Sequence, residues 1–231
     1  MIPGKITLIG GGPSNVELIT IRAIEKLKKA HVILYDSLVD ERTLEFAPNA
    51  EKIFVGKRKG CVAYTQQEIN QMLVNFAKEG KNTVRLKGGD VFVFGRGFEE
   101  LEFAKNQQIE VEVVPGVSSA FSVPLLYEIF PTEKTKHQGV WVITATTKSH
   151  DLSKDLLDAV NYQGTVIIFM GITKIKEIIQ LYLSNQQQHK TIYVIENGYR
   201  QNQQLTFGKI ESFENQIPEK GFESPGLIII K

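Results

Sequence analysis

Apolar positions along the chain follow two alternating patterns. Short runs rich in β-branched residues have the length and composition of strands, and in the first half they cover residues 5–10, 31–36, 51–56, 82–87 and 111–116. Longer segments repeat apolar residues at helical spacing, over residues 16–30, 65–80 and 98–108. The middle one begins with Thr65 and Glu68 in capping-box register and ends at Gly80. This alternation predicts an α/β unit with a largely parallel sheet.

A polar segment interrupts the pattern at residues 127–138. It reads YEIFPTEKTKHQ and has no period, so we predict a domain boundary there, which separates residues 1–130 from residues 131–231. A second α/β unit then follows, with a helix from about Asp151. Its other predicted elements are a helix at 175–184 and strands within 139–147, 164–171, 191–198, 203–210 and 226–231.

The glycine cluster in LIGGGPSN directly follows the first predicted strand. A dinucleotide cradle requires Gly-x-Gly-x-x-Gly at the start of a helix, with an acidic residue about 20 positions further on. Gly10 and Gly12 supply two glycines and Asp36 supplies an acid, but the third glycine position holds Asn15. Pro13 also lacks an amide that could donate to a phosphate. The local sequence leaves open whether the cluster binds a ligand or is simply a tight turn.

Composition narrows the class of protein. The 231 residues are 42% hydrophobic, enough for one large core or two modest ones, and the net charge of +1 gives no field that would recruit nucleic acid or a membrane. The single cysteine, Cys61, excludes an internal disulfide and suits a reducing cytosol, and the four histidines lack zinc-site spacing. No apolar run approaches the roughly 18 residues of a membrane helix, and the N-terminus does not have the pattern of a signal peptide. We therefore predict a soluble cytoplasmic protein without a metal site.

Three predicted loops carry side chains suited to a ligand. In KGGDVFVFGRG the glycine pair lets the backbone approach a ligand, Asp90 can accept hydrogen bonds, and Arg96 can pair with a carboxylate. GKRKG at 56–60 gathers cations that could bind a polyanion, and Asp36 ends a strand at the edge where α/β sheets bind ligands. Each motif also has an ordinary interpretation, as a glycine turn, a solvated basic turn or an aspartate that forms a turn.

Taken together, the motifs resemble a known family. The stretches LIGGGPSNVELITIRA, AHVILYDSLV, IFVGKRKG, QEINQMLV, VRLKGGDVFVFGRG, VVPGVSSA, IIFMG, VIENG and SPGLIII occur in order along essentially the whole chain. They closely resemble the uroporphyrinogen-III C-methyltransferases of the tetrapyrrole methylase superfamily, and KGGDVFVFGRG is the most specific piece. The resemblance implies two α/β domains with a ligand cleft between them, S-adenosylmethionine as the cofactor held partly by each domain, and a homodimer. The glycine turn would then serve S-adenosylmethionine, and Pro13 belongs to the pattern.

The same resemblance implies roles for single residues. Asp36 matches the position of a proton acceptor, Lys57 that of a proton donor, and Arg96 that of an arginine implicated in substrate binding and deprotonation. Lys57, Arg58, Arg96 and Glu99 are expected to bind the substrate, whose carboxylates suit basic partners. The positions that match cofactor contacts are Pro13, Gly88, Gly89, Asp90, Val93, Ser118, Ser119, Met170 and Gly198.

The chain also departs from the family pattern. An aspartate of the first loop is replaced by Asn15, and the proline after the Gly-Gly-Asp turn by Val91. Three positions that often hold histidine are Val62, Glu133 and Thr146. Most of these changes fall on the side expected to bind substrate, so the resemblance indicates the cofactor and the reaction type more strongly than the exact tetrapyrrole.

The leading hypothesis is two methylations of uroporphyrinogen III, through precorrin-1 to precorrin-2, on the route to siroheme or cobalamin. Alternatives on the same fold are a methylase of a later corrinoid precursor and a ribosomal RNA ribose methyltransferase, which should carry a more basic surface than a net charge of +1 provides. A nicotinamide dehydrogenase is disfavoured by Pro13, and a non-catalytic binding protein by the presence of Asp36, Lys57 and Arg96. The sequence leaves open the number and order of the methylations.

Overall fold

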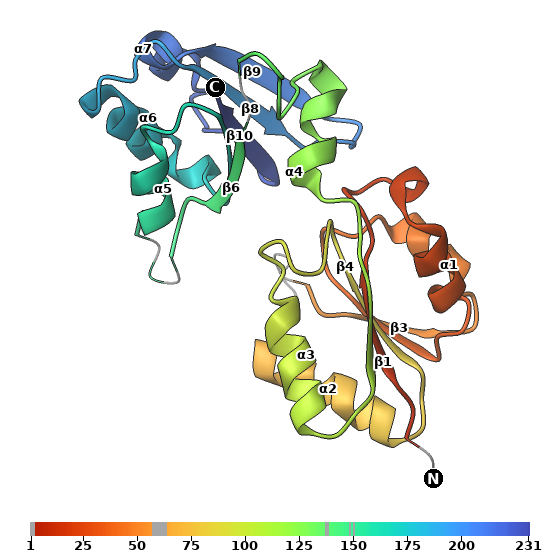
Figure 1. The fold of residues 1–231 in the computed structure, drawn as a ribbon. Coiled ribbons are helices and arrows are strands. Elements are labelled where there is room, and N and C mark those ends of the chain that lie inside the picture. Colours follow the sequence, from red (N-terminus) through yellow and green to blue (C-terminus); the bar gives the residue numbers. More distant parts are fainter. Residues whose placement is uncertain (1–2, 57–63, 137–138, 148, 150) are drawn as a thin grey trace. The chain divides into compact units, whose positions relative to one another are not determined.

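The computed structural model describes residues 3–56, 64–136, 139–147, 149 and 151–231. The chain forms two compact units, Met1–Ser119 and Ala120–Lys231, each with its own five-stranded sheet (Figure 1). The division falls earlier than residue 130, where the sequence placed it. The reason is packing, because Ala120, Val123 and Ile129 belong to a hydrophobic cluster of the second unit.

The sheet of the first unit is entirely parallel, as the alternation of strands and helices predicts, and its strand order is β3-β2-β4-β1-β5. Its strands are β1 (Ile6–Gly10), β2 (Val32–Tyr35), β3 (Glu51–Phe54), β4 (Thr83–Lys87) and β5 (Val111–Val114). The chain leaves β1 toward β2 on one side and leaves its neighbour β4 toward β5 on the other. The adjacent ends of β1 and β4 therefore form a topological switch point, where open α/β sheets bind ligands.

Helices cover both faces of this sheet (Figure 1). Ile6 and Leu8 pack with α2 (Gln66–Lys78) and α3 (Gly97–Asn106). Ile9, the next residue of the strand, packs with α1 (Ile21–Leu27) on the opposite face. The short helix η2 (Glu41–Phe46) lies on the α1 side. Apolar side chains on both faces explain why the strands are continuous apolar runs rather than alternating ones.

One predicted helix is divided in two, and another begins at its predicted capping box. The helical spacing at 16–30 spans two elements, η1 (Val16–Leu18) and α1, because Thr20 is extended and its hydroxyl caps Ala23. The capping box of Thr65 and Glu68 is present at the start of α2, as predicted.

The second unit has a mixed sheet of order β6-β7-β10-β8-β9. Only β6 and β7 pair in parallel, and the other three pairings are antiparallel. The strands are β6 (Val140–Thr144), β7 (Thr165–Phe169), β8 (Thr191–Glu196), β9 (Gln204–Lys209) and β10 (Gly226–Ile230). Because β10 runs antiparallel to both of its neighbours, β6, β7 and β8 point the same way and end at one edge.

Helices also cover both faces of this second sheet (Figure 1). Ile168 of β7 packs toward α5 (Lys154–Ala159), α6 (Ile175–Ser184) and α7 (Ile210–Phe213). The adjacent Ile167 packs toward the segment that contains α4 (Ser119–Ser122) and η3 (Pro124–Tyr127). The helix expected from about Asp151 begins at Lys154, after the N-cap Ser153. Two further short helices of this unit are η4 (Ile172–Lys174) and η5 (Glu214–Gln216). In the part of the chain that the structure describes, no helix has the length and apolar character needed to cross a membrane.

Glu112 on the edge strand β5 joins this strand to α1. Its carboxylate lies 2.7 Å from Lys26 Nζ, 2.9 Å from Arg22 Nη2 and 3.3 Å from Lys5 Nζ. The hydrogen bond from Lys26, aided by those from Arg22 and Lys5, lowers the pKa of Glu112 to about 2.

We expect Glu112→Gln to lower the free energy of unfolding by about 1 kcal/mol at pH 7, because the ion pairs are partly solvated. The folded pKa is below the ordinary value of 4.5, so this contribution is complete above pH 4.5 and is lost as the pH falls toward 2. Urea unfolding of both proteins between pH 7 and pH 2.5 measures it, with Glu110→Gln as the control. A difference that stays constant over this range would contradict the ion-pair account.

Candidate active site

Three glycine-containing loops meet at the switch point of the first sheet. They follow the adjacent strands β4, β1 and β5, and backbone hydrogen bonds join the first two. Gly89 N donates to Gly12 O at 2.7 Å, Gly12 N donates to Gly89 O at 3.2 Å, and Gly11 N donates to Lys87 O at 2.7 Å. Gly12 and Gly89 have φ of 80° and 67°, in the left-handed region that favours glycine.

The third loop approaches the other two at backbone distance. A Cβ atom on Gly116 would lie 2.2 Å from Gly89 O and 2.6 Å from the carbonyl carbon of Gly10, and a Cβ on Gly10 would lie 2.5 Å from Gly116 N. Side chains at these positions would push the loops apart. The residue type is therefore fixed by contact between main chains.

Asp90 binds two of these loops together. Its Oδ2 accepts a hydrogen bond from Gly116 N at 3.1 Å, and its Oδ1 accepts one from Phe92 N at 2.9 Å. Pro13, Gly88, Gly89, Asp90 and Ser118, all predicted to contact the cofactor, lie in these three loops, and Ser119 begins α4 directly after the third loop. The structure brings their segments together at one edge of one sheet.

Asp36 follows β2, at the same edge. Its Oδ1 accepts a hydrogen bond from Leu38 N at 3.2 Å, and its Oδ2 lies 3.3 Å from Arg85 Nη2. The loop of Asp36 is attached to its neighbours, because Ser14 Oγ donates to Leu38 O at 2.9 Å and Gly88 lies against Leu38. The side chain of Asp36 keeps 24% of its surface exposed. Its carboxylate is therefore held by hydrogen bonds and is also partly accessible to solvent.

Arg85 belongs to a buried group of charges that is not among the site residues predicted from the sequence. Glu100 on α3 accepts three hydrogen bonds at its Oε1, each of 3.0 Å, from Gln66 Nε2, Arg85 Nε and Lys87 Nζ. Glu100 is completely buried, and the side chains of Arg85 and Lys87 are 5% exposed. Burial lowers the pKa of Lys87, the charge of Arg85 acts in the same direction, and Glu100 opposes them.

The sequence contained a signal for this group. Arg85 and Lys87 alternate with Leu86 in a strand that is otherwise apolar, and Glu100 occupies a position on α3 that faces the core. Charged residues are almost never fully buried unless they are paired, so two such residues in a core strand predict a buried partner.

Arg96 and Glu99, both predicted to bind substrate, form an ion pair with each other. Arg96 Nε lies 2.9 Å from Glu99 Oε1, and Arg96 Nη2 lies 2.6 Å from Glu99 Oε2. The hydrogen bonds from Arg96 to Glu99 raise the pKa of Arg96. Both side chains are about half exposed, and Arg96 has a φ of 59° at the N-cap of α3. The loop that contains Val93 therefore ends in a cation that projects toward solvent.

Met170 and Gly198 stand at one edge of the second sheet, where β7 and β8 end. Met170 has a φ of 55° and is 52% exposed, and a Cβ on Gly198 would lie 2.7 Å from Val123 Cγ1. Their contact with the cofactor stays a prediction. Lys57, Arg58 and Val62 lie outside the described residues.

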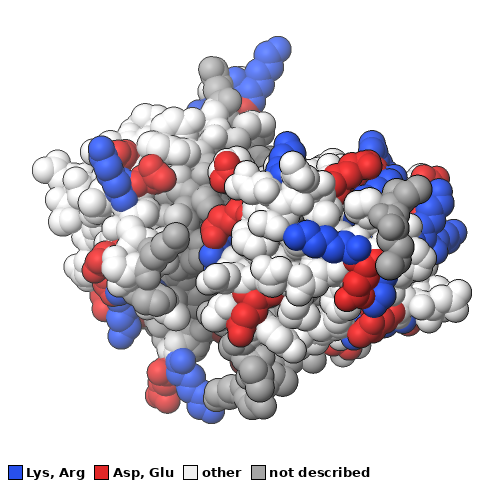
Figure 2. Space-filling view, turned by 90° about the horizontal axis from the view of Figure 1, so that it is seen from below, with Lys and Arg blue, Asp and Glu red and all other residues white. Residues whose placement is uncertain are grey.

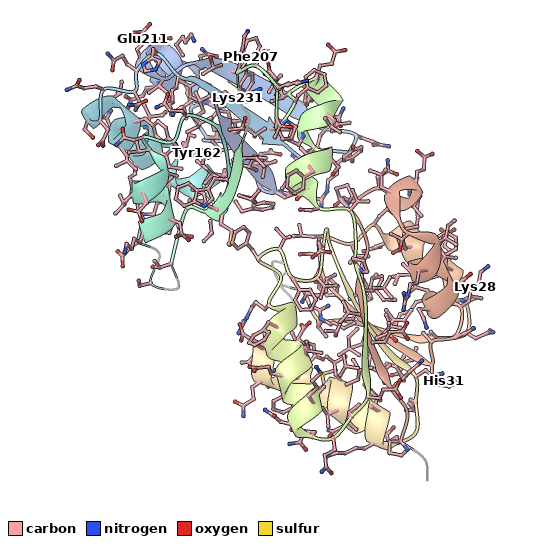
Figure 3. All side chains as sticks on the ribbon, in the orientation of Figure 1. Lys28, His31, Tyr162, Phe207, Glu211 and Lys231 are labelled. Atoms are coloured by element: carbon pink, nitrogen blue, oxygen red, sulfur yellow. The ribbon has the colours of Figure 1, made fainter. Side chains whose placement is uncertain are left out.

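His31 is remote from the glycine loops of its unit. It precedes β2, at the amino edge of the first sheet (Figure 3), and its Nδ1 accepts a hydrogen bond from Asn82 N at 2.8 Å. This histidine therefore has a structural partner at the end of the sheet opposite to Asp36.

Comparison with known proteins adds independent evidence. A family model for tetrapyrrole (corrin/porphyrin) methylases matches residues 5–214. The chain is 39% identical to a uroporphyrinogen-III C-methyltransferase of Methanocaldococcus jannaschii, over 98% of this chain and 95% of that protein. It is 37% identical to siroheme synthase 1 of Cronobacter sakazakii, of which it covers 48%.

Solved structures agree with these relatives. A uroporphyrin-III C-methyl transferase from Thermus thermophilus, complexed with S-adenyl homocysteine, has a TM-score of 0.83 and 32% identity. The alignment covers 98% of this chain and 97% of that one. A cobalt precorrin-4 methyltransferase has a TM-score of 0.86, with 98% of this chain and 94% of that one covered, and at 22% identity it supports the fold alone.

The contact between glycine loops makes a prediction for stability. Gly116→Ala should lower the free energy of unfolding by at least about 2 kcal/mol, since its Cβ meets only backbone atoms of Gly89 and Gly10. Gly11→Ala is the matched control in the same loops, because its nearest contacts are 3.2 Å and 3.3 Å, and it should cost about 1 kcal/mol or less. Urea unfolding followed by circular dichroism measures both. Equal effects of the two variants would contradict the contact account.

Proposed function

The chain belongs to the tetrapyrrole methylase family, and from this premise we propose that it transfers methyl groups from S-adenosylmethionine to carbon atoms of uroporphyrinogen III. The product is precorrin-2, formed through precorrin-1, on the route to siroheme or cobalamin. The observation that carries the proposal is the meeting of three glycine loops at the switch point, in a chain whose full-length relative is a uroporphyrinogen-III C-methyltransferase.

The glycine loops fit S-adenosylmethionine. When bound, this cofactor supplies an electrophilic methyl group on a cationic sulfur, so carbonyls and a carboxylate suit it better than basic side chains. Gly89, Gly116 and Asp90, which are all partly exposed, present such groups. Pro13 is compatible with this ligand, since no pyrophosphate needs its amide.

Asp36 acts as the base in this proposal. The substrate carbon is an electron-rich pyrrole position, which needs no nucleophilic side chain from the protein, and the chain's task is to orient the substrate and to remove a proton. Asp36 suits this task because its carboxylate is held from one side by Arg85 and by a backbone amide, and it is partly exposed.

Arg96 binds a carboxylate of the substrate. Its planar guanidinium already forms a two-point contact with Glu99, which fixes its direction, and an anion can approach the exposed remainder of the group. We expect Lys57 and Arg58 to assist, since the preceding strand β3 belongs to the same sheet. Lys57 as a proton donor, the homodimer and the cytoplasmic location stay predictions.

The charge distribution bears on the RNA alternative. On the face shown in Figure 2, acidic and basic side chains are interspersed, and the net charge of the chain is +1. An enzyme that binds RNA is expected to gather cations on one face. The tetrapyrrole substrate therefore remains the better match.

The proposal is tested by anaerobic incubation of the purified chain with S-adenosylmethionine and uroporphyrinogen III, followed by mass spectrometry. We expect singly and then doubly methylated products. S-adenosylhomocysteine should stabilise the folded protein by about 2.7 kcal/mol at 100 times its Kd, and NAD should not stabilise it. If the chain methylates only a later corrinoid precursor, uroporphyrinogen III is not its substrate. Stabilisation by NAD alone would refute the methyltransferase assignment.

Asp36→Asn tests the base. The amide is almost isosteric but cannot take a proton, so we expect turnover to fall by roughly 100-fold or more, with little change in cofactor affinity. Steady-state kinetics and calorimetry with S-adenosylhomocysteine measure the two effects. If Asp36→Asn keeps wild-type turnover, Asp36 only shapes the turn after β2.

A further inference from the structure

Arg85 makes contacts in four directions from the interior of the first unit. Its Nε donates to Glu100 at 3.0 Å, and its Nη1 donates to Leu34 O at 3.3 Å and to Leu86 O at 3.1 Å. Its Nη2 reaches Asp36 Oδ2 at 3.3 Å. The guanidinium is thus fixed in position and orientation. Of the two carboxylates that it contacts among the described residues, Glu100 is buried and Asp36 is partly exposed.

The buried charges around Arg85 balance one another. Arg85 and Lys87 supply two cations, and Glu100 and Asp36 supply two carboxylates. Glu100 is the centre of the group, because its Oε1 receives Arg85, Lys87 and Gln66, while its Oε2 has no hydrogen-bond partner among the described residues. Lys87 allows Glu100 to remain paired without taking Arg85 away from Asp36.

Stability alone does not account for this arrangement. Removing ions from water is costly, and apolar residues of similar volume often stabilise a core as well or better. The group lies on the face of the sheet that packs against α2 and α3, where Leu34, Ile6 and Leu8 already provide an apolar core. The physical effect that an apolar core cannot supply is a fixed cation beside Asp36.

We propose that Arg85 is a positioning residue for Asp36, and that Glu100 and Lys87 hold Arg85 in place. This inference rests on the proposed role of Asp36 as the base. The Arg85–Asp36 contact and the Leu38 N–Asp36 contact each engage one carboxylate oxygen, so the carboxylate cannot rotate freely. Each oxygen has a second lone pair, which remains to accept the substrate proton. Arg85 keeps its own charge throughout, because guanidinium does not deprotonate in proteins.

The proposal requires that Arg85 acts through Asp36, which a double-mutant cycle measures. The four proteins are the wild type, Asp36→Asn, Arg85→Met and the double variant. Arg85→Met should lower kcat by about 10- to 100-fold, the cost of a misplaced reacting group, and should leave the affinity for S-adenosylhomocysteine unchanged. In the Asp36→Asn background the same substitution should have little further effect on kcat, since the group that it positions is already lost.

Two further variants complete the experiment. Arg85→Lys keeps the charge without the fork geometry, so it should recover part of the lost kcat, and it takes the place of Arg85→Met in the cycle if that variant does not fold. Arg22→Met is the matched control, because Arg22 forms an exposed ion pair with Glu112 on the opposite side of the same unit's sheet, and it should leave kcat unchanged.

The outcomes separate the two claims. If the wild type does not methylate uroporphyrinogen III, the proposed function is wrong. If the wild type is active and Asp36→Asn is impaired, but Arg85→Met lowers kcat equally in both backgrounds or not at all, the positioning role is wrong. If Asp36→Asn keeps full turnover, Asp36 is not the base and the positioning role is refuted with it.

Discussion

The close approach of three main-chain loops is the constraint on which the rest of the first unit depends. Gly10 and Gly116 lie at distances that exclude a Cβ, and Gly12 and Gly89 pair through two backbone hydrogen bonds. This contact closes the switch point between β1 and β4 and attaches the loop after β5 to it. The loop after β2 is attached in turn by Ser14 and Gly88. Four strand ends thereby become one surface.

A second layer of charges lies directly beneath this surface. Arg85 and Lys87 come from β4, immediately before the Gly88–Gly89 turn, and Glu100 comes from the helix that follows the loop of Arg96. Because the same segment contributes both the glycine turn and the buried cations, the position of Asp36 depends on the same strand that forms the glycine contact. In our proposal, cofactor binding and proton removal therefore share one rigid support, which is what a reaction between two positioned ligands needs.

The sequence allowed much of this to be predicted, for physical reasons that differ between elements. The parallel sheet follows from apolar runs that alternate with helical spacing, and the capping box of Thr65 and Glu68 is a local signal that no tertiary contact overrides. The break at Thr20 and the antiparallel β10 depend on long-range packing, which periodicity does not contain. The candidate site was predictable where backbone geometry demands glycine. Arg85 and Glu100 were missed because their pairing joins a strand to a helix across the core.

The departures from the family pattern follow the same distinction between backbone and side chain. Asn15 replaces an aspartate, yet its side-chain oxygen accepts a hydrogen bond from Glu17 N at 2.9 Å and caps η1, a role that an amide fills as well as a carboxylate. Glu133 stands where the family pattern often has a histidine, and it lies 2.6 Å from Lys231 and forms an ion pair within the second unit. A site made from backbone atoms tolerates a replacement such as Asn15 beside it, because its geometry depends on the absence of side chains rather than on their identity. In our proposal, the cofactor side is built in this way and the substrate side from individual cations, and substitutions near the substrate therefore bear on the choice of tetrapyrrole before they bear on methyl transfer itself.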